Sequence, residues 1–240
     1  MRPDADHSIH ALGDQALTVS FGNQISETVH ARVMGLYHSL QERPLRGMSE
    51  VVPSYTSLTV FYDLLQLPPD SVSVWERQRD ELELRIAALH HREQEEGVLH
   101  VVPVCYEPGC APDLEMIAYA RNLTPAELVR IHSAITYRVY LIGFLPGFAY
   151  MGDVDERIAA PRKPRPVSTP AGSVGIAGRQ TGIYPFDSPG GWNLVGRTPW
   201  RLFNPDRTEA PCRFRAGDRV RFEPISNGEY KKLHEEEYGS

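Results

Sequence analysis

The first hundred residues alternate between two hydrophobic periods. Short apolar runs typical of strands occur at residues 16–21 (ALTVSF), 51–52 and 58–62 (LTVFY). Between them, Ser26 can cap a helix whose apolar residues recur at helical spacing until the break at 44–47 (PLRG). A second helix is predicted from Ser71 or Ser73 to residues 94–97 (QEEG). This order predicts a small α+β sandwich, with one sheet and its helices on one side.

The remainder of the chain predicts a mainly-β region. A strand at 98–104 is followed by a capping box, Thr124 to Glu127 with Pro125 at the first helical position, and then by an alternating strand at 137–142. Short strand candidates separated by turn signals follow at residues 174–177, 182–184, 192–195, 200–203 and 220–222. Many short strands of this kind predict a β-barrel or a β-sandwich.

These patterns predict three parts of the chain. We expect an N-terminal α+β domain over residues 1–96, a mainly-β domain over residues 97–226, and a polar tail over residues 227–240 that frays. The boundary between the two domains is placed at Gly97.

Glycine and proline concentrate between Gly143 and Gly196. This stretch holds ten of the 19 glycines and seven of the 20 prolines, interleaved with aromatic residues and few charges. Glycine permits positive φ and close backbone approach, whereas proline fixes φ. The composition fits a preformed concave site lined by backbone groups, and it equally fits a β-domain with many tight turns.

Charge and composition exclude some functions. The formal net charge of −6 argues against nucleic-acid and anionic-membrane binding, which need a surplus of Lys and Arg. The first twenty residues predict no signal peptide, and no apolar run approaches the roughly 20 residues of a membrane span. A zinc site at Cys105 and Cys110 would need His100 and His132 to converge. Three cysteines favour reduced thiols in a cytoplasmic protein, and no metal is predicted.

Three familiar catalytic motifs fail in the glycine-rich stretch. The sequence has neither a P-loop nor a helical pattern after its glycines, so it fits neither phosphate-binding fingerprint. Ala171 stands where a G-x-S-x-G elbow needs its first glycine. Ser173 therefore fits a hydroxyl that binds a ligand or turn backbone better than a nucleophile.

Several side chains are candidates for a site. His132, near the end of the capped helix, is either a partner of the helix dipole or an acid, base or hydrogen-bond donor. Arg162 suits a carboxylate or phosphate, and Gln180, Thr181 and Asn193 are polar residues embedded in glycine-rich sequence. Five aromatic residues fit core or pocket wall, namely Tyr140, Phe144, Phe148, Tyr150 and Trp192.

Three long motifs carry a family resemblance. The stretches YLIGFLPGFAYMG, TPAGSVGIAGRQTGIYP and SPGGWNLVGRTP resemble the family of the 5-oxoprolinase B subunit, also called allophanate hydrolase subunit 1. This family includes an inhibitor of a sporulation histidine kinase and part of the carboxyltransferase domain of urea carboxylase (subdomains C and D). The resemblance reaches from the N-terminal region to about Pro224, and Met151 and Ser168–Thr169 depart from the usual pattern without removing chemistry.

The resemblance implies an architecture and partners. It implies an N-terminal α+β domain followed by a cyclophilin-like β-barrel, a partner of the C-subunit type with a related barrel, and a third component, the A subunit. His132 and Arg162 are then expected to be catalytic. The expected substrate-binding residues are Tyr140, Gly172, Ser173, Gly175, Gln180, Thr181, Trp192 and Asn193.

Three functions follow from the resemblance. The first is ATP-dependent opening of 5-oxo-L-proline to L-glutamate by the complete complex. Coupling to ATP suits a resonance-stabilised lactam, and backbone N–H groups between Gly172 and Gly182 are expected to hold the oxyanion. The alternatives are an inhibitor that binds a sensor histidine kinase, and a carboxyltransferase or allophanate hydrolase-type subunit.

Overall fold

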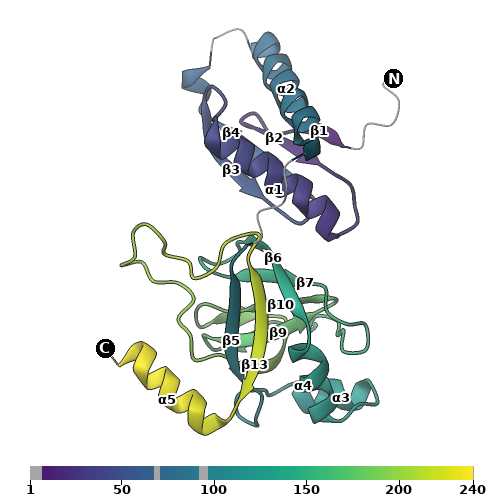
Figure 1. The fold of residues 1–240 in the computed structure, drawn as a ribbon, viewed down its shortest axis with the longest axis vertical. Coiled ribbons are helices and arrows are strands. Elements are labelled where there is room, and N and C mark those ends of the chain that lie inside the picture. Colours follow the sequence, from purple (N-terminus) through teal and green to yellow (C-terminus); the bar gives the residue numbers. More distant parts are fainter. Residues whose placement is uncertain (1–6, 68–70, 92–96, 240) are drawn as a thin grey trace. The chain divides into compact units, whose positions relative to one another are not determined.

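A computed structural model describes residues 7–67, 71–91 and 97–239. The chain divides into two compact units, Met1–Glu95 and Glu96–Ser240, and each is described by itself. Figure 1 shows the ribbon of both units, with elements labelled in chain order.

The first unit is a four-stranded antiparallel sheet with two helices. Its strands lie in the order β1-β2-β4-β3. The strands are β1 (Ser8–Leu12), β2 (Ala16–Ser20), β3 (Met48–Pro53) and β4 (Ser57–Tyr62). The helices are α1 (Glu27–Glu42) and α2 (Ser71–Ala87), with 3-10 turns η1 (Leu64–Gln66) and η2 (Ala88–His91). Both helices share one apolar core with the sheet, since Leu36 of α1 and Leu82 of α2 pack with Val60 of β4.

Local signals place α1 where the sequence predicts it. The Ser26 hydroxyl accepts a hydrogen bond from the Val29 N–H at 3.2 Å, which caps the helix, and α1 ends before Pro44. Strand β1 was not predicted, because all its residues except Ile9 are exposed and it has no apolar run. Residues 94–96, where the second helix was expected to end, lie outside the described residues.

The second unit is built on a closed seven-stranded barrel, which is one of the two architectures that the short strand candidates predicted. Its strands follow the order β10-β7-β6-β13-β5-β12-β9. They are β5 (Leu99–Cys105), β6 (Thr136–Ile142), β7 (Ala149–Gly152), β9 (Ser173–Ala177), β10 (Gln180–Ile183), β12 (Asn193–Arg197) and β13 (Arg219–Ile225). Strands β8 (Val167–Thr169) and β11 (Ser188–Gly190) form a separate antiparallel pair.

Strands β5 and β13 pair in parallel, whereas the other pairs in the barrel are antiparallel. Figure 1 shows these two strands running side by side along the barrel wall. Helices α3 (Leu114–Ala120) and α4 (Pro125–Ser133) follow β5, and Leu128 of α4 belongs to the barrel core. The predicted capping box is confirmed, because Thr124 and Glu127 exchange both hydrogen bonds.

Two sequence predictions were wrong in the second unit. Residues 200–203 form no strand, and Phe203 makes only an isolated bridge with Cys212. The N–H groups of Trp200 and Arg201 bond to the side chains of Thr198 and Glu237 and so cannot pair with a neighbouring strand.

The C-terminal segment forms helix α5 (Asn227–Tyr238) instead of a fraying tail. Ser226 and Glu229 make a second capping box, and Tyr230 is buried against Cys105 and Cys110. Across the described ranges of the chain, none of the helices has the length and apolar character needed to cross a membrane.

Candidate functional site

The glycine-rich stretch includes the β9–β10 hairpin of the barrel wall. Gly175 pairs with Gly182, and neither position has room for a side chain. A Cβ on Gly182 would lie 2.8 Å from the Ala149 carbonyl oxygen, and one on Gly175 would lie 3.0 Å from the Trp192 Cβ. These two glycines therefore serve close packing of the barrel wall.

Backbone donors of this hairpin are already occupied. The Gly172 N–H donates to the Tyr184 carbonyl at 2.7 Å, and the Gly178 N–H donates to the Ala160 carbonyl at 2.6 Å. The Ser173 N–H donates to the Pro170 carbonyl at 3.2 Å. The structure thus leaves these three N–H groups unavailable as an oxyanion hole, contrary to the expectation from sequence, because turn and strand bonds consume them.

His132 lies inside the barrel at the end of α4 and is fully buried. Its Nδ1 is 2.8 Å from the Tyr106 hydroxyl, and its Nε2 is 3.1 Å from the Thr181 hydroxyl, which donates to the Gly175 carbonyl at 3.0 Å. The imidazole also stacks on Phe222, with ring centroids 4.7 Å apart. Both ring nitrogens are therefore held by protein groups.

Burial lowers the pKa of His132 to about 3, so the imidazole is neutral at physiological pH. The aromatic hydroxyls facing it belong to Tyr106 and Tyr137, and burial raises the pKa of both. No carboxylate among the described residues forms an ion pair with His132. The arrangement is a satisfied polar network that ties α4 to the barrel wall.

Arg162 lies outside the barrel on an aromatic platform. Its side chain is exposed, and its Cζ lies 5.9 Å from the centroid of the Trp192 ring. Trp192 packs edge-on against Phe148 and Tyr150, with centroids 5.5 and 5.8 Å apart. We call Phe148, Tyr150, Tyr184 and Trp192 the aromatic platform.

Electrostatics place the guanidinium close to the platform hydroxyls. Burial raises the pKa values of Tyr150 and Tyr184, and the charge of Arg162 opposes the rise in both. Arg162 is therefore a cation over the Trp192 ring, and its charge acts on two phenol groups of the platform. The guanidinium can bind a carboxylate, and Tyr150 is the platform ring that a ligand can reach, because Phe148, Tyr184 and Trp192 are buried.

The segment that carries Arg162 is fixed on both sides. The buried Asn193 amide donates to the Pro161 carbonyl at 2.7 Å and to the Ile176 carbonyl at 3.3 Å. On the other side, the Lys163 N–H donates to the Gly191 carbonyl at 2.7 Å. The Lys163 ammonium also pairs with the Asp113 carboxylate at 2.6 Å. Anchors at the two flanking residues hold the Arg162 backbone in place, which reduces the entropy lost on binding a ligand.

The other predicted residues lie either in the barrel wall or in the barrel interior. Gln180 is half-buried at the start of β10, opposite Gly152, while Tyr140 is buried with its ring 3.4 Å from where a Cβ on Gly152 would lie. Ser173 is buried at the start of β9.

Strand β9 lies between β10, which carries Thr181, and β12, which carries Asn193. Ile176 is paired with Thr181 on one side and with Asn193 on the other. Thr181 and Asn193 therefore lie on the two strands that flank β9. Thr181 bonds to His132 in the interior, whereas Asn193 supports the segment of Arg162.

Sequence reasoning missed several supporting residues. Tyr106, Asp113 and Lys163 lie far along the chain from their partners, and no local motif marks them. The aromatic character of Phe148 and Tyr150 was noted, but their packing with Trp192 depends on the closure of the barrel.

The histidines and cysteines do not gather into a metal site. His100 pairs with Asp218 at 3.0 Å, and His132 bonds to Tyr106 and Thr181. Within residues 7–67, 71–91 and 97–239, no group of three or more His, Cys, Asp or Glu residues could hold a metal ion. All three cysteines are free thiols.

Curated relatives align with almost the whole chain. The chain is 43% identical over 236 residues to the 5-oxoprolinase B subunit of Bacillus subtilis, covering 96% of this chain and 98% of the relative. It is 34% identical over 221 residues to the 5-oxoprolinase B subunit of Escherichia coli O157:H7, covering 91% of this chain and 96% of the relative. The chain is therefore similar in sequence and in extent to proteins of that name.

A solved structure supports the same relationship. The crystal structure of TTHA0988 superposes with a TM-score of 0.74 at 34% identity and covers 89% of this chain. The chain spans only 40% of the length of TTHA0988. Residues 7–214 match the family model described as "Carboxyltransferase domain, subdomain C and D". The chain therefore belongs to the carboxyltransferase subdomain C and D family, which the three glycine-rich motifs indicated from sequence.

Proposed function

We propose that this chain is the B subunit of an ATP-dependent 5-oxoprolinase, which opens 5-oxo-L-proline to L-glutamate. The observation that carries this proposal is the alignment with the 5-oxoprolinase B subunit of Bacillus subtilis along 98% of that relative. Agreement over nearly the whole of both chains supports a shared role better than agreement over one domain, since function resides in sites and not in folds.

The geometry of the aromatic platform supports a small cyclic carboxylate as ligand. The exposed Arg162 guanidinium, carried on an anchored backbone, can bind the carboxylate of 5-oxoproline with charge-assisted hydrogen bonds. The apolar methylene edge of the five-membered ring can then rest against the half-buried Tyr150, which packs on the buried Trp192. In this proposal Arg162 and Tyr150 contact the substrate, and Trp192 supports the Tyr150 ring.

The interior network has a different part in the proposal. A neutral, fully buried His132 with both nitrogens bonded has no path to a substrate on the platform, so we assign it and Thr181 to positioning β10. Asn193 holds the Arg162 segment, and Gln180, Tyr140, Gly172, Ser173 and Gly175 shape the hairpin.

We propose that ATP acts in the complete assembly. Phosphorylation of the lactam oxygen would convert a poor electrophile into one with a good leaving group, and this chain has no glycine-lysine loop for a nucleotide. The curated relatives are named as subunits, and TTHA0988 is a longer chain that contains a similar region. These facts support two partners, a C-type subunit with a related barrel and an A-type subunit.

The finer architecture belongs to the same proposal. The first unit is the α+β sandwich domain, the barrel is of the cyclophilin type, and the protein acts in the cytoplasm. The charge of −6 and the small platform favour a small-molecule ligand over nucleic acid or membrane.

Reconstitution tests the proposed function. The chain is combined with its A-type and C-type partners, and ATP hydrolysis is measured with and without 5-oxo-L-proline. We expect 5-oxoproline-dependent hydrolysis only when all three chains are present. An assembled complex whose ATP hydrolysis ignores 5-oxoproline would overturn the proposal.

Carboxyl transfer is a second candidate, favoured by the description of the family model. It would require biotin delivered by another chain. In the same assembly, ATP hydrolysis that depends on bicarbonate and a biotinylated partner, and not on 5-oxoproline, would favour this candidate.

A further inference from the structure

A cavity of about 320 Å³ lies in the first unit, beside helix α2. This volume is within the range of small-molecule sites. Part of its lining is apolar and comes from the turn after α1 and from the end of η1, namely Pro44, Leu45 and Leu67. The rest of the lining is polar and comes from the same turn and from one face of α2, namely Arg46, Arg77, Gln78, Glu81 and Arg85.

The polar part of the lining leaves a positive charge unpaired. Among the described residues that line the cavity, Glu81 is the only carboxylate, and it is already paired with Arg85, whose Nε donates to its Oε1 at 3.0 Å. Arg46 is exposed, and its guanidinium makes no hydrogen bond or ion pair with the described part of the chain. The charge of Arg46 is therefore available to an anion in the cavity.

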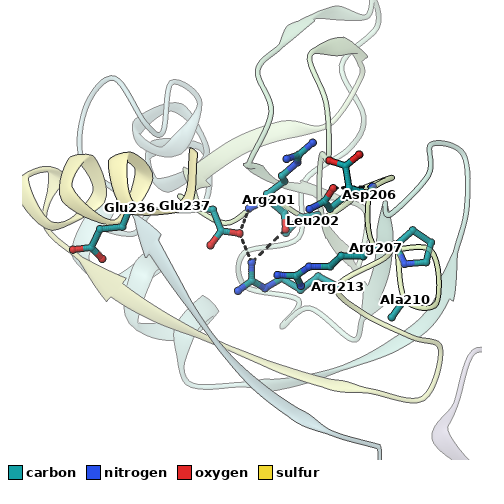
Figure 2. Close-up of a pocket in the computed structure, with 10 residues that line it drawn as sticks. Arg201, Leu202, Asp206, Arg207, Ala210, Arg213, Glu236 and Glu237 are labelled. Atoms are coloured by element: carbon teal, nitrogen blue, oxygen red, sulfur yellow. Dashed lines mark hydrogen bonds and ion pairs between the residues drawn. The ribbon is translucent and has the colours of Figure 1, made fainter. Parts of the chain in front are cut away.

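The cavity drawn in Figure 2 has no such unpaired charge. It lies in the barrel unit, has a volume of about 380 Å³, and is lined by three arginines and three carboxylates, namely Arg201, Arg207, Arg213, Asp206, Glu236 and Glu237. The Arg213 guanidinium is paired with the Glu237 carboxylate at 2.6 Å. Because the opposite charges in that lining balance, it gives no reason to expect an anion, whereas the lining beside α2 does.

Two polar side chains of α2 are held in place at the cavity. Nη1 of Arg85 donates to the carbonyl and to the hydroxyl of Ser39 at 3.0 and 3.3 Å, and its Nη2 has no partner among the described residues. Gln78 is only 8% exposed, and its Nε2 donates to the Arg46 carbonyl at 3.3 Å. The amide nitrogen carries a second N–H, which remains for a ligand. Groups fixed in this way lose little entropy when they bind.

The turn that carries Arg46 is fixed as well. The Met48 N–H donates to the Leu45 carbonyl at 3.0 Å, and Gly47 between them has a positive φ of 73°. A Cβ on Gly47 would lie 2.7 Å from the Leu67 Cδ2, so the turn packs closely against that side chain. The cavity thus combines a cation on a well-held turn with the apolar surface of two leucines.

We propose that this cavity binds a small organic carboxylate with an apolar chain. The guanidinium of Arg46 and the Nη2 of Arg85 bind the carboxylate oxygens, and the Gln78 amide adds a hydrogen bond. The apolar chain packs against the two leucine side chains. This site is independent of the proposed 5-oxoprolinase activity and of the platform at Arg162.

Titration calorimetry on the full chain tests the proposal with three probes, each at up to about 10 mM. The first probe, 4-methylpentanoate, has both the charge and the apolar chain. Acetate keeps the charge without the chain, and 4-methylpentanamide keeps the chain without the charge. We expect saturable binding of 4-methylpentanoate and at least about tenfold weaker binding of the other two. Failure of 4-methylpentanoate to bind, or equal binding of either comparison probe, would overturn the proposal.

Three variants make the test specific to this cavity. Arg46→Gln should weaken 4-methylpentanoate binding at least about tenfold, because it removes the unpaired charge. The matched control, Arg43→Gln, changes an exposed arginine of the same segment that does not line the cavity, and it should leave the affinity unchanged. Arg162→Ala should also leave the affinity unchanged, because the platform belongs to the barrel unit.

Circular dichroism checks that each variant is folded. Equal affinities of the unaltered chain, Arg43→Gln and Arg46→Gln would show that Arg46 does not form the site. Binding that is lost in Arg162→Ala and kept in Arg46→Gln would place the carboxylate on the platform, and it would likewise overturn the proposal.

Discussion

The barrel unit contains two polar clusters that the sequence places together and the structure separates. His132 and Thr181 are fully buried, neutral and bonded to protein groups on every side. Arg162 is exposed and charged, and it lies above aromatic rings on an anchored segment. One cluster uses its hydrogen-bonding capacity within the fold, whereas the other presents its charge to solvent. Polar residues within one motif can therefore serve stability and function separately.

The largest expected effect is on the interior cluster. His132→Ala should lower the free energy of unfolding by about 3–5 kcal/mol, because it leaves a cavity beside Phe222 and removes a partner from two buried hydroxyls. Urea unfolding of the full chain measures the change. Arg130→Ala on the exposed face of α4 is the control and should stay within about 0.5 kcal/mol. Equal unfolding free energies for the two variants would show that the His132 cluster does not stabilise the fold.

The same cluster predicts a pH dependence. The pKa of His132 is lowered to about 3 in the folded chain, whereas its ordinary value is 6.5. Between these two pH values the unfolded chain binds a proton at His132 and the folded chain does not. The stability associated with this group is complete above pH 6.5 and falls as the pH drops toward 3. Between pH 6.5 and 5 the loss is about 2 kcal/mol.

Urea unfolding at several pH values, with His132→Gln as comparison, isolates this contribution. Glutamine carries no titrating group. Between pH 6.5 and 5, the unfolding free energy of His132→Gln should therefore fall by about 2 kcal/mol less than that of the unaltered chain. The carboxylates of Asp155, Glu127 and Glu229, whose pKa values are lowered by hydrogen bonds, are present in both proteins and cancel in the comparison. Parallel slopes would show that His132 accepts a proton in the folded state.

Asn193 lies between the two clusters and should affect both stability and activity. Asn193→Ala leaves the Pro161 carbonyl without its side-chain donor and should cost about 1–2 kcal/mol in unfolding free energy. Because the Arg162 segment then loses an anchor, we also expect a higher KM for 5-oxoproline in the reconstituted assembly. A stability loss with an unchanged KM would separate Asn193 from the platform.

Local patterns predicted much of the fold. The cap at Ser26, the capping box at Thr124 and four of the five short strand candidates depend on neighbouring residues and are found in the structure. The second capping box, at Ser226, was readable by the same rule but was overlooked in an acidic segment. The strand predicted at residues 200–203 does not form, because the N–H groups of Trp200 and Arg201 bond to the side chains of Thr198 and Glu237 instead of a neighbouring strand.

The candidate site was predicted less completely. The sequence identified His132, Arg162 and Asn193, but it could not show which of them faces the interior, since that depends on the closure of the barrel. Glycine-rich sequence suggested free backbone donors, yet the Gly172 and Gly178 N–H groups bond across turns. Long-range partners such as Asp113 and Lys163 are set by tertiary structure alone.

The central claim is that Arg162 serves the ligand and not the fold. The most direct test is kcat/KM for 5-oxoproline-dependent ATP hydrolysis by the reconstituted assembly carrying Arg162→Ala, with assembly checked by size-exclusion chromatography. Arg165→Ala, an exposed arginine in the same segment, is the matched control. We expect at least a tenfold fall in kcat/KM for Arg162→Ala, no change for the control, and a change in unfolding free energy below about 0.5 kcal/mol for both. An assembled Arg162→Ala complex with unaltered kcat/KM would contradict it.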